Sequence, residues 1–275
     1  MARTKAVVGT GARFSDYLSA RLLARVYPAA MIGEILHAHS CHSKRIRSLS
    51  AGAGTYFGMA LSLYPEAAYA HVFAVVSQGF SWMQGKEVSV TIAKSSLSDM
   101  RGKIGDAPLQ TLMARACIPL ADATHHPAAC YAGLRLVAID GSNLEVADEP
   151  DNLSALGYPG RRTGHAGYPQ AQCAVLVECG SHAIINANLG AYRESEWTIC
   201  TPLLASLDDR MLCLADRGVN GDTHWAAAQA PGAQLLWRCA RNRTLPVVKA
   251  LSDGSYSQRA VSGWHNLQEA TTGFP

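Results

Sequence analysis

The segment Leu134-Arg-Leu-Val-Ala-Ile-Asp-Gly-Ser142 decides the fold class, because the sequence changes there from helical to strand-like periodicity. Its apolar run ends at Asp140, and a second apolar run, Met211-Leu-Cys-Leu-Ala215, ends in the same way at Asp216. Short apolar runs bounded by Gly, Asp and Ser are typical of buried strands. A carboxylate at the carboxyl end of a strand faces the crevice in which α/β sheets bind ligands.

Asp140 and Asp216 are therefore candidate metal ligands. Two carboxylates on neighbouring strands suit an oxygen-loving divalent cation such as Mg²⁺. A pair of such ions clamps the attacking and leaving oxygens of a phosphoryl transfer. The alternative is that each Asp only caps a turn or the next helix, and the strand pattern by itself leaves both interpretations open.

The two halves of the chain differ in periodicity. Apolar residues with helical spacing, interrupted by prolines, predict six helices in the first half: 14–26, 29–39, 51–63, 67–78, 95–103 and 108–120. A linker at 122–129 follows. The second half predicts strands at 134–139, 171–178, 182–189, 211–215 and 235–238, helices at 194–207 and 223–229, and a long loop at 148–170. We expect an α+β protein with a helical N-terminal domain (1–125) and an α/β domain (126–275).

The composition excludes several classes of protein. Hydrophobic residues make up 48% and charged residues 16% of the 275 residues, which excludes wholesale disorder. No apolar run reaches the roughly 18 residues of a membrane span, so we expect a cytoplasmic protein without a membrane partner. The eight cysteines form no C-x-x-C pair and most of them lie in apolar surroundings, which favours free thiols over disulfides.

The net charge of +3 conceals an asymmetry. Residues 1–130 carry 13 Lys/Arg against 7 Asp/Glu, a balance of +6, whereas residues 131–275 carry 11 against 14, a balance of −3. This distribution suggests an N-terminal half that meets a polyanion and a C-terminal half whose carboxylates hold cations.

An ordered series of phrases resembles the DDE transposases of the insertion sequence 4 family. Tyr131-Ala-Gly-Leu-Arg-Leu-Val-Ala-Ile-Asp-Gly-Ser142 is similar to the first catalytic segment, and Leu212-Cys-Leu-Ala-Asp-Arg-Gly218 is the strongest match. Further matches are Leu61 to Pro65, Ser95 to Leu112, Tyr168 to Gln170, Val177 to Ala183, Leu235 to Arg238, Leu245-Pro246 and Asp253 to Tyr256. The resemblance covers about residues 11 to 259. Each phrase alone is weak evidence for the family, whereas the ordered series is specific to it.

This resemblance implies a ribonuclease H-like catalytic domain, with Asp140 on its first strand and Asp216 after its fourth. It also implies binding of double-stranded DNA, at transposon ends and at the target, by a protein that is a homodimer on DNA in the bacterial nucleoid. The family chemistry is metal-dependent hydrolysis at the transposon ends, followed by attack of the freed 3′-OH on target DNA. Asp140 and Asp216 would hold two Mg²⁺ ions, for which Mn²⁺ can substitute.

The third carboxylate of this family does not appear in the sequence. The family places a Glu on a later helix, in a Tyr-x2-Arg-x3-Glu-x6-Lys signature beyond a β-rich insertion. Tyr256-Ser-Gln-Arg259 matches the opening of that signature, but Gly263 stands at the Glu position, and residues after Arg259 no longer resemble the family. A frameshift or early stop within the insertion is our hypothesis. A truncated transposase that only binds DNA as a regulator, or a relic without function, remains the alternative.

Basic residues supply candidate contacts to DNA phosphates, with solvent-exposed or structural roles as the alternative for each. They are Lys44, Arg45, Arg47, Arg101, Lys103, Arg161, Arg162, Arg217, Arg238, Arg241 and Arg243. Among the remaining acids, Glu194 and Glu196 stand at a predicted helix start, where the helix dipole favours acids, so we interpret them as helix-start residues. Glu178, on a predicted strand, is interpreted as a structural partner.

Overall fold

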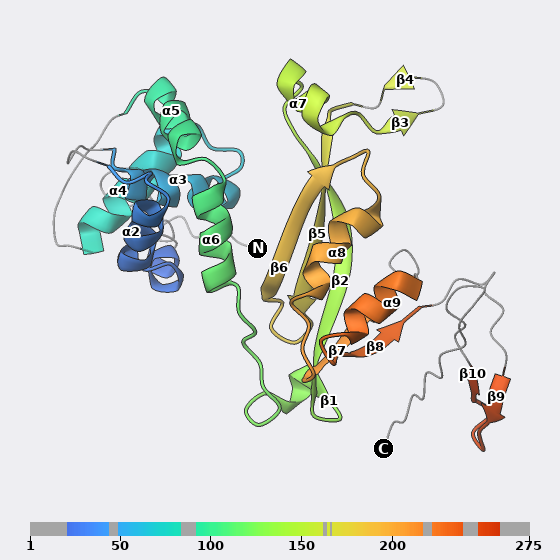
Figure 1. Ribbon diagram of the computed structural model, residues 1–275. Coiled ribbons are helices and arrows are strands. Elements are labelled where there is room, and N and C mark those ends of the chain that lie inside the picture. Colours follow the sequence, from blue (N-terminus) through green and yellow to red (C-terminus); the bar gives the residue numbers. More distant parts are fainter. Residues whose placement is uncertain are drawn as a thin grey trace. The chain divides into compact units, whose positions relative to one another are not determined.

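A computed structural model describes residues 21–43, 49–83, 92–161, 164–165, 167–216, 222–238 and 247–258. The chain divides into two compact units, Met1–Ala116 and Cys117–Pro275. The first unit is helical where it is described, and the second combines helices with a mixed sheet, which confirms the predicted α+β class (Figure 1). None of the described helices is long and apolar enough to cross a membrane.

The first unit is built from short helices around one apolar core. After a helical segment at 21–26, they are α2 (Ala29–Ala38), α3 (Ala51–Leu63), α4 (Tyr69–Met83), α5 (Lys94–Ile104) and α6 (Ala107–Ala116). Ser50 begins α3 by accepting a hydrogen bond from the Ala53 N–H, which satisfies one of the free donors of the first turn. Phe57, which is fully buried, packs edge-on against Tyr69 and Phe73 of α4.

Five helix predictions for this unit match described helices, with small differences at the ends. The predicted helix 108–120 stops at Ala116, four residues early. Pro119 accounts for the difference, because a proline disfavours helical backbone at the residue before it and cannot donate a helical hydrogen bond.

The second unit is organised around a sheet with the strand order β6-β5-β2-β7-β8 (Figure 1). The strands are β2 (Leu134–Glu145), β5 (Gln170–Glu178), β6 (Ile184–Ala191), β7 (Met211–Ala215) and β8 (Gln234–Trp237), and β1 (Cys130–Tyr131) also pairs with β2. The pairs β2–β5 and β5–β6 are antiparallel, whereas β2–β7 and β7–β8 are parallel. The strands predicted at 171–178 and 182–189 correspond to β5 and β6, which form an antiparallel hairpin.

Helices α8 (Glu196–Leu204) and α9 (Asp222–Gln229) pack on one face of this sheet. Ile199 and Leu203 of α8 are buried in one cluster with Val137 of β2 and Cys213 of β7. Ser195 begins α8 by accepting a hydrogen bond from the Thr198 N–H. The seven cysteines in the described part of the chain are free, as expected.

The region from 148 to 170 was predicted as a loop without secondary structure, and that prediction is wrong in part. It contains the helix α7 (Pro150–Leu156) and the two-residue strands β3 (Gly160–Arg161) and β4 (Gly164–His165). Pro150 occupies the first turn of α7, where its missing N–H costs nothing. A hairpin of β9 (Val247–Ala250) and β10 (Tyr256–Gln258) was also not predicted.

Candidate functional site

Asp140 and Asp216 follow equivalent positions on two adjacent parallel strands. β2 and β7 are aligned from Arg135 opposite Met211 to Ile139 opposite Ala215, and the next residues are the two aspartates. Both aspartates are exposed. Because parallel strands end at the same edge of a sheet, the register brings these two carboxylates to one place.

The prediction that Asp140 ends its strand is wrong. β2 continues for five more residues to Glu145, and Asp140 lies opposite Val175 of β5 in the antiparallel ladder. The strand that ends here is β7, at Ala215. Asp140 is thus at the point where β2 loses its parallel neighbour, which leaves its side chain exposed beside the end of β7.

An open groove of about 500 Å³ joins Asp140 and Asp216 to a third predicted residue, Arg238. Arg238 follows β8, and its backbone N–H donates to the carbonyl oxygen of Ala215 at 3.0 Å. That bond continues the β7–β8 pairing by one step and fixes where the Arg238 side chain leaves the sheet. The groove therefore combines two acidic side chains with one cationic side chain at the same edge.

Three carboxylates near this edge of the sheet act together on a nearby thiol. Burial, followed by the charges of Glu196, Asp140 and Asp216, raises the pKa of the Cys200 thiol to about 11. A single thiol on α8 thus lies within the field of all three carboxylates. Asp140 also accepts a hydrogen bond from the Gly141 N–H at 2.8 Å through Oδ1.

Glu196 is the acid whose position the sequence did not reveal. A Cβ atom on Gly141 would lie 3.2 Å from Glu196 Oε1, so this carboxylate packs over the backbone next to Asp140. Gly141 and Glu196 line a smaller cavity of about 190 Å³, together with Ser142, Asn143 and Gln172. No sequence signal could have shown this, because the approach depends on how α8 packs across β2 and β5. Glu194 has a local role instead, since its Oε1 accepts from the Ala191 N–H.

The residues present supply part of a magnesium site. Asp140 and Asp216 offer carboxylate oxygens, which are the ligands that Mg²⁺ prefers. In the described part of the chain, however, no three His, Cys, Asp or Glu side chains converge on a common metal position. Two carboxylates with water as the remaining ligands are compatible with Mg²⁺, which usually keeps several waters.

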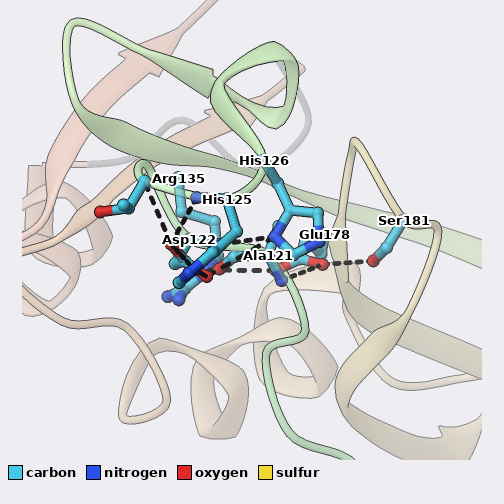
Figure 2. A network of polar contacts seen from close by, with 8 residues as sticks. Ala121, Asp122, His125, His126, Arg135, Glu178 and Ser181 are labelled. Atoms are coloured by element: carbon cyan, nitrogen blue, oxygen red, sulfur yellow. Dashed lines mark hydrogen bonds and ion pairs between the residues drawn. The ribbon is translucent and has the colours of Figure 1, made fainter.

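Glu178 is a structural partner, as predicted. Its carboxylate is fully buried, and Oε1 lies 3.0 Å from Nε of Arg135. Both carboxylate oxygens accept from the Ala121 N–H, at 3.0 and 3.1 Å, and Ser181 Oγ donates to Oε2 (Figure 2). Arg135 Nε also donates to the Ala121 carbonyl at 2.8 Å. This network attaches the segment that enters the second unit to the start of β2.

Asp122 organises the turn that follows this attachment (Figure 2). Its Oδ1 accepts from the backbone N–H groups of Thr124 and His125, both at 2.9 Å. Hydrogen bonds from the His125 backbone and side chain are the main causes that lower the pKa of Asp122 to about 2. The predicted linker is thus a structured turn that leads into a 3₁₀ segment, Pro127–Ala129.

The predicted phosphate contacts are only partly described. Arg101 and Lys103 are exposed on α5, and Arg238 lies in the groove. The side chains of eight others lie outside the described residues: Lys44, Arg45, Arg47, Arg161, Arg162, Arg217, Arg241 and Arg243. The predictions of a missing third acid and of a truncation concern residues from 259 onward, which also lie outside the described residues.

Comparison with known proteins finds a family model for the helical unit and two sequence relatives of the chain. Residues 18–114 match the family model described as "Insertion element 4 transposase N-terminal", which falls within the helical unit. A putative transposase, InsZ of Escherichia coli (strain K12), is 29% identical over 127 residues, covering 46% of this chain and 42% of the relative. The transposase InsG for insertion sequence element IS4, from the same organism, is 31% identical over 159 residues, covering 52% of this chain and 35% of the relative.

The chain matches less than half of the length of each of these relatives. Among solved structures, a piggyBac transposase synaptic complex with hairpin DNA has a TM-score of 0.34 and 11% identity, covering 88% of this chain and 45% of that one. A Mos1 transposase paired-end complex has a TM-score of 0.27 and 12% identity, covering 70% and 61%. Those two likenesses are too distant to support an argument. The family match and the two sequence relatives show that this chain is similar to transposases of the insertion sequence 4 family.

Proposed function

We propose that this chain acts on DNA as a transposase, with Asp140 and Asp216 as the metal-binding pair of its second unit. The observation that carries the proposal is the parallel register of β2 and β7, which brings the two aspartates to one edge of the sheet. Arg238 in the same groove adds a cation suited to a phosphate.

A ribonuclease H-like arrangement of the second unit is part of the proposal. In chain order the main strands are β2, β5, β6, β7 and β8, of which the first three form an antiparallel meander and the last two add in parallel. Asp140 then lies on the first main strand and Asp216 after the fourth, as the family resemblance implies. We assign the helical unit to DNA binding, in keeping with the domain limits 1–125 and 126–275.

The chemistry follows from charge. The carboxylates of Asp140 and Asp216 would hold divalent ions at the groove, and Arg238 would orient a phosphate of the DNA backbone beside them. Bound Mg²⁺ supplies Lewis-acid stabilisation of the charge that develops on the attacking and leaving oxygens. The β2–β7 pairing keeps the two aspartates in register, so that the groove is formed before DNA arrives.

A DNA-binding regulator without cleavage activity is the second candidate. It is favoured by the observation that only two carboxylates of the groove, and no third metal ligand, come together within the described residues. Such a protein would occupy the transposon ends through its helical unit and leave them uncut.

A cleavage assay separates these candidates. Labelled duplexes taken from the ends of the element that encodes this chain are incubated with the full chain and Mg²⁺ or Mn²⁺. The proposal predicts nicking that Asp140→Asn and Asp216→Asn abolish and that Asp151→Asn, an exposed acid on α7, preserves. Binding without nicking by the unaltered chain supports the regulator, and the absence of both contradicts any DNA function.

A further inference from the structure

The helical unit carries a pair of cations around one aromatic ring. The Lys94 Nζ atom lies 5.8 Å from the centroid of the Tyr69 ring, and the Arg101 guanidinium lies 5.7 Å from it. Arg101 Nη1 also donates a hydrogen bond to the Tyr69 hydroxyl at 2.7 Å. These three residues, Tyr69, Lys94 and Arg101, are called the Tyr69 patch below.

The ring at the centre of the patch is fixed by the core. Tyr69 begins α4 and packs edge-on against the fully buried Phe57 of α3, with 5.6 Å between the ring centroids. Leu97 of α5, also fully buried, anchors the helix that carries the two cations. The ring and the helix that carries the two cations are therefore held by packing, and within the described residues no acid forms an ion pair with either cation.

The two cations share a face of α5 because they are seven residues apart, which is close to two helical turns. Within the described residues, the ion pairs of arginines join Arg115 to Glu34, Arg135 to Glu178 and Arg210 to Asp208, and none involves Lys94 or Arg101. Two like charges near one ring without a counter-charge repel each other, and an anion between them removes that repulsion.

Arg115 of α6 has a different environment. Its Nη1 atom lies 3.2 Å from Glu34 Oε2 of α2, so its charge is offset by an acid of the same unit. Arg115 therefore provides a matched control for Arg101.

We propose that the Tyr69 patch binds two phosphates of a DNA backbone, an inference that rests on the proposed DNA function. An arginine has five N–H donors and only one is used by Tyr69, so the guanidinium retains donors for a phosphate. One DNA strand carries a phosphate every ~3.4 Å along the helix axis, so a single strand offers successive phosphates to the two cations. The contact is to the backbone and does not select sequence.

The test is the salt dependence of DNA binding by the full chain. Anisotropy of a labelled random-sequence duplex is titrated between about 50 and about 200 mM KCl with the unaltered chain, Lys94→Gln, Arg101→Gln and the matched control Arg115→Gln. Each lost phosphate contact makes the negative slope of log K against log salt less steep by about 0.9, so the salt-induced loss of affinity shrinks about 3.5-fold per variant. We expect this change for Lys94→Gln and Arg101→Gln and an unchanged slope for Arg115→Gln.

A second variant separates phosphate contact from folding. Arg101→Lys keeps the charge while it alters the hydrogen bond to Tyr69, so it is expected to keep the salt slope of the unaltered chain. Slopes that are equal in all variants, or an Arg115→Gln effect as large as that of Arg101→Gln, overturn the assignment of the patch. If the unaltered chain does not bind the duplex at all, the proposed DNA function fails and this inference fails with it.

Discussion

Arg135 Nε and Glu178 Oε1 lie 3.0 Å apart, and they form the one buried Arg–carboxylate ion pair in the described part of the chain. Only 11% of the Arg135 side chain is exposed, and none of the Glu178 side chain. The pair is also joined to the backbone of Ala121 on both its N–H and its carbonyl side. Arg135, near the start of β2, thus helps to determine how the chain enters the second unit.

Glu178→Gln should destabilise the second unit strongly. The change leaves the Arg135 charge buried without its partner, and breaking such a pair costs about 3–5 kcal/mol. Denaturant unfolding of the full chain measures the loss, and Glu149→Gln, an exposed acid, should change stability by less than about 0.5 kcal/mol. A loss below about 1 kcal/mol for Glu178→Gln contradicts this account of the network. Glu178→Leu combined with Arg135→Met should recover part of the loss, because an apolar pair leaves no buried charge.

Asp122 should titrate far below an ordinary aspartate, with a pKa of about 2. Because this folded-state pKa is depressed, the stabilisation is present above the ordinary value of 3.8 and is lost as the pH falls from 3.8 toward 2. His125→Ala should raise the pKa of Asp122 only part of the way toward 3.8, because the backbone N–H at residue 125 still donates to the carboxylate. An NMR pH titration of the carboxyl carbon checks both values, and an Asp122 that titrates near 3.8 in the unaltered chain refutes the turn geometry.

Gly180→Ala should destabilise the second unit where Gly180 packs against Ala129 of the 3₁₀ segment. A Cβ at Gly180 would lie 2.2 Å from Ala129 Cβ and 2.8 Å from Ala129 Cα, so backbone must move. Overpacking of this kind costs about 1–3 kcal/mol. Gly160→Ala is the control, because no atom lies within 4 Å of the added methyl group. Equal midpoints of thermal unfolding for the two variants would show that residues 129 and 180 are not in contact.

Much of the fold could be predicted from local pattern, because buried segments carry strong periodicity. The helix 51–63 and the strand 211–215 were predicted with the limits that the structure shows, since Ser50 and Asp216 mark a start and an end that local chemistry determines. The helix α7 was missed because it has no buried residue and thus no apolar period. The length of β2 was underestimated because its exposed second half is paired with β5, a contact distant in sequence.

The residues of the candidate site could be predicted from the sequence, whereas their geometry could be predicted only in part. The strand-end pattern and the family phrases both selected Asp140 and Asp216, but only the parallel register of β2 and β7 places them side by side. The proximity of Glu196 to Gly141 and the position of Arg101 beside the Tyr69 ring depend on tertiary packing and could not be predicted from spacing alone.

The most direct test of the account is calorimetric titration of the full chain with Mn²⁺, because it measures the metal pair without requiring cleavage. The account predicts that Asp140→Asn and Asp216→Asn each weaken Mn²⁺ binding at least tenfold, about 1.4 kcal/mol, and that Asp151→Asn leaves it unchanged. Mn²⁺ binding of the same strength in the Asp140→Asn and Asp216→Asn variants as in the unaltered chain, or no binding by the unaltered chain, contradicts the claim that these two aspartates form one metal site.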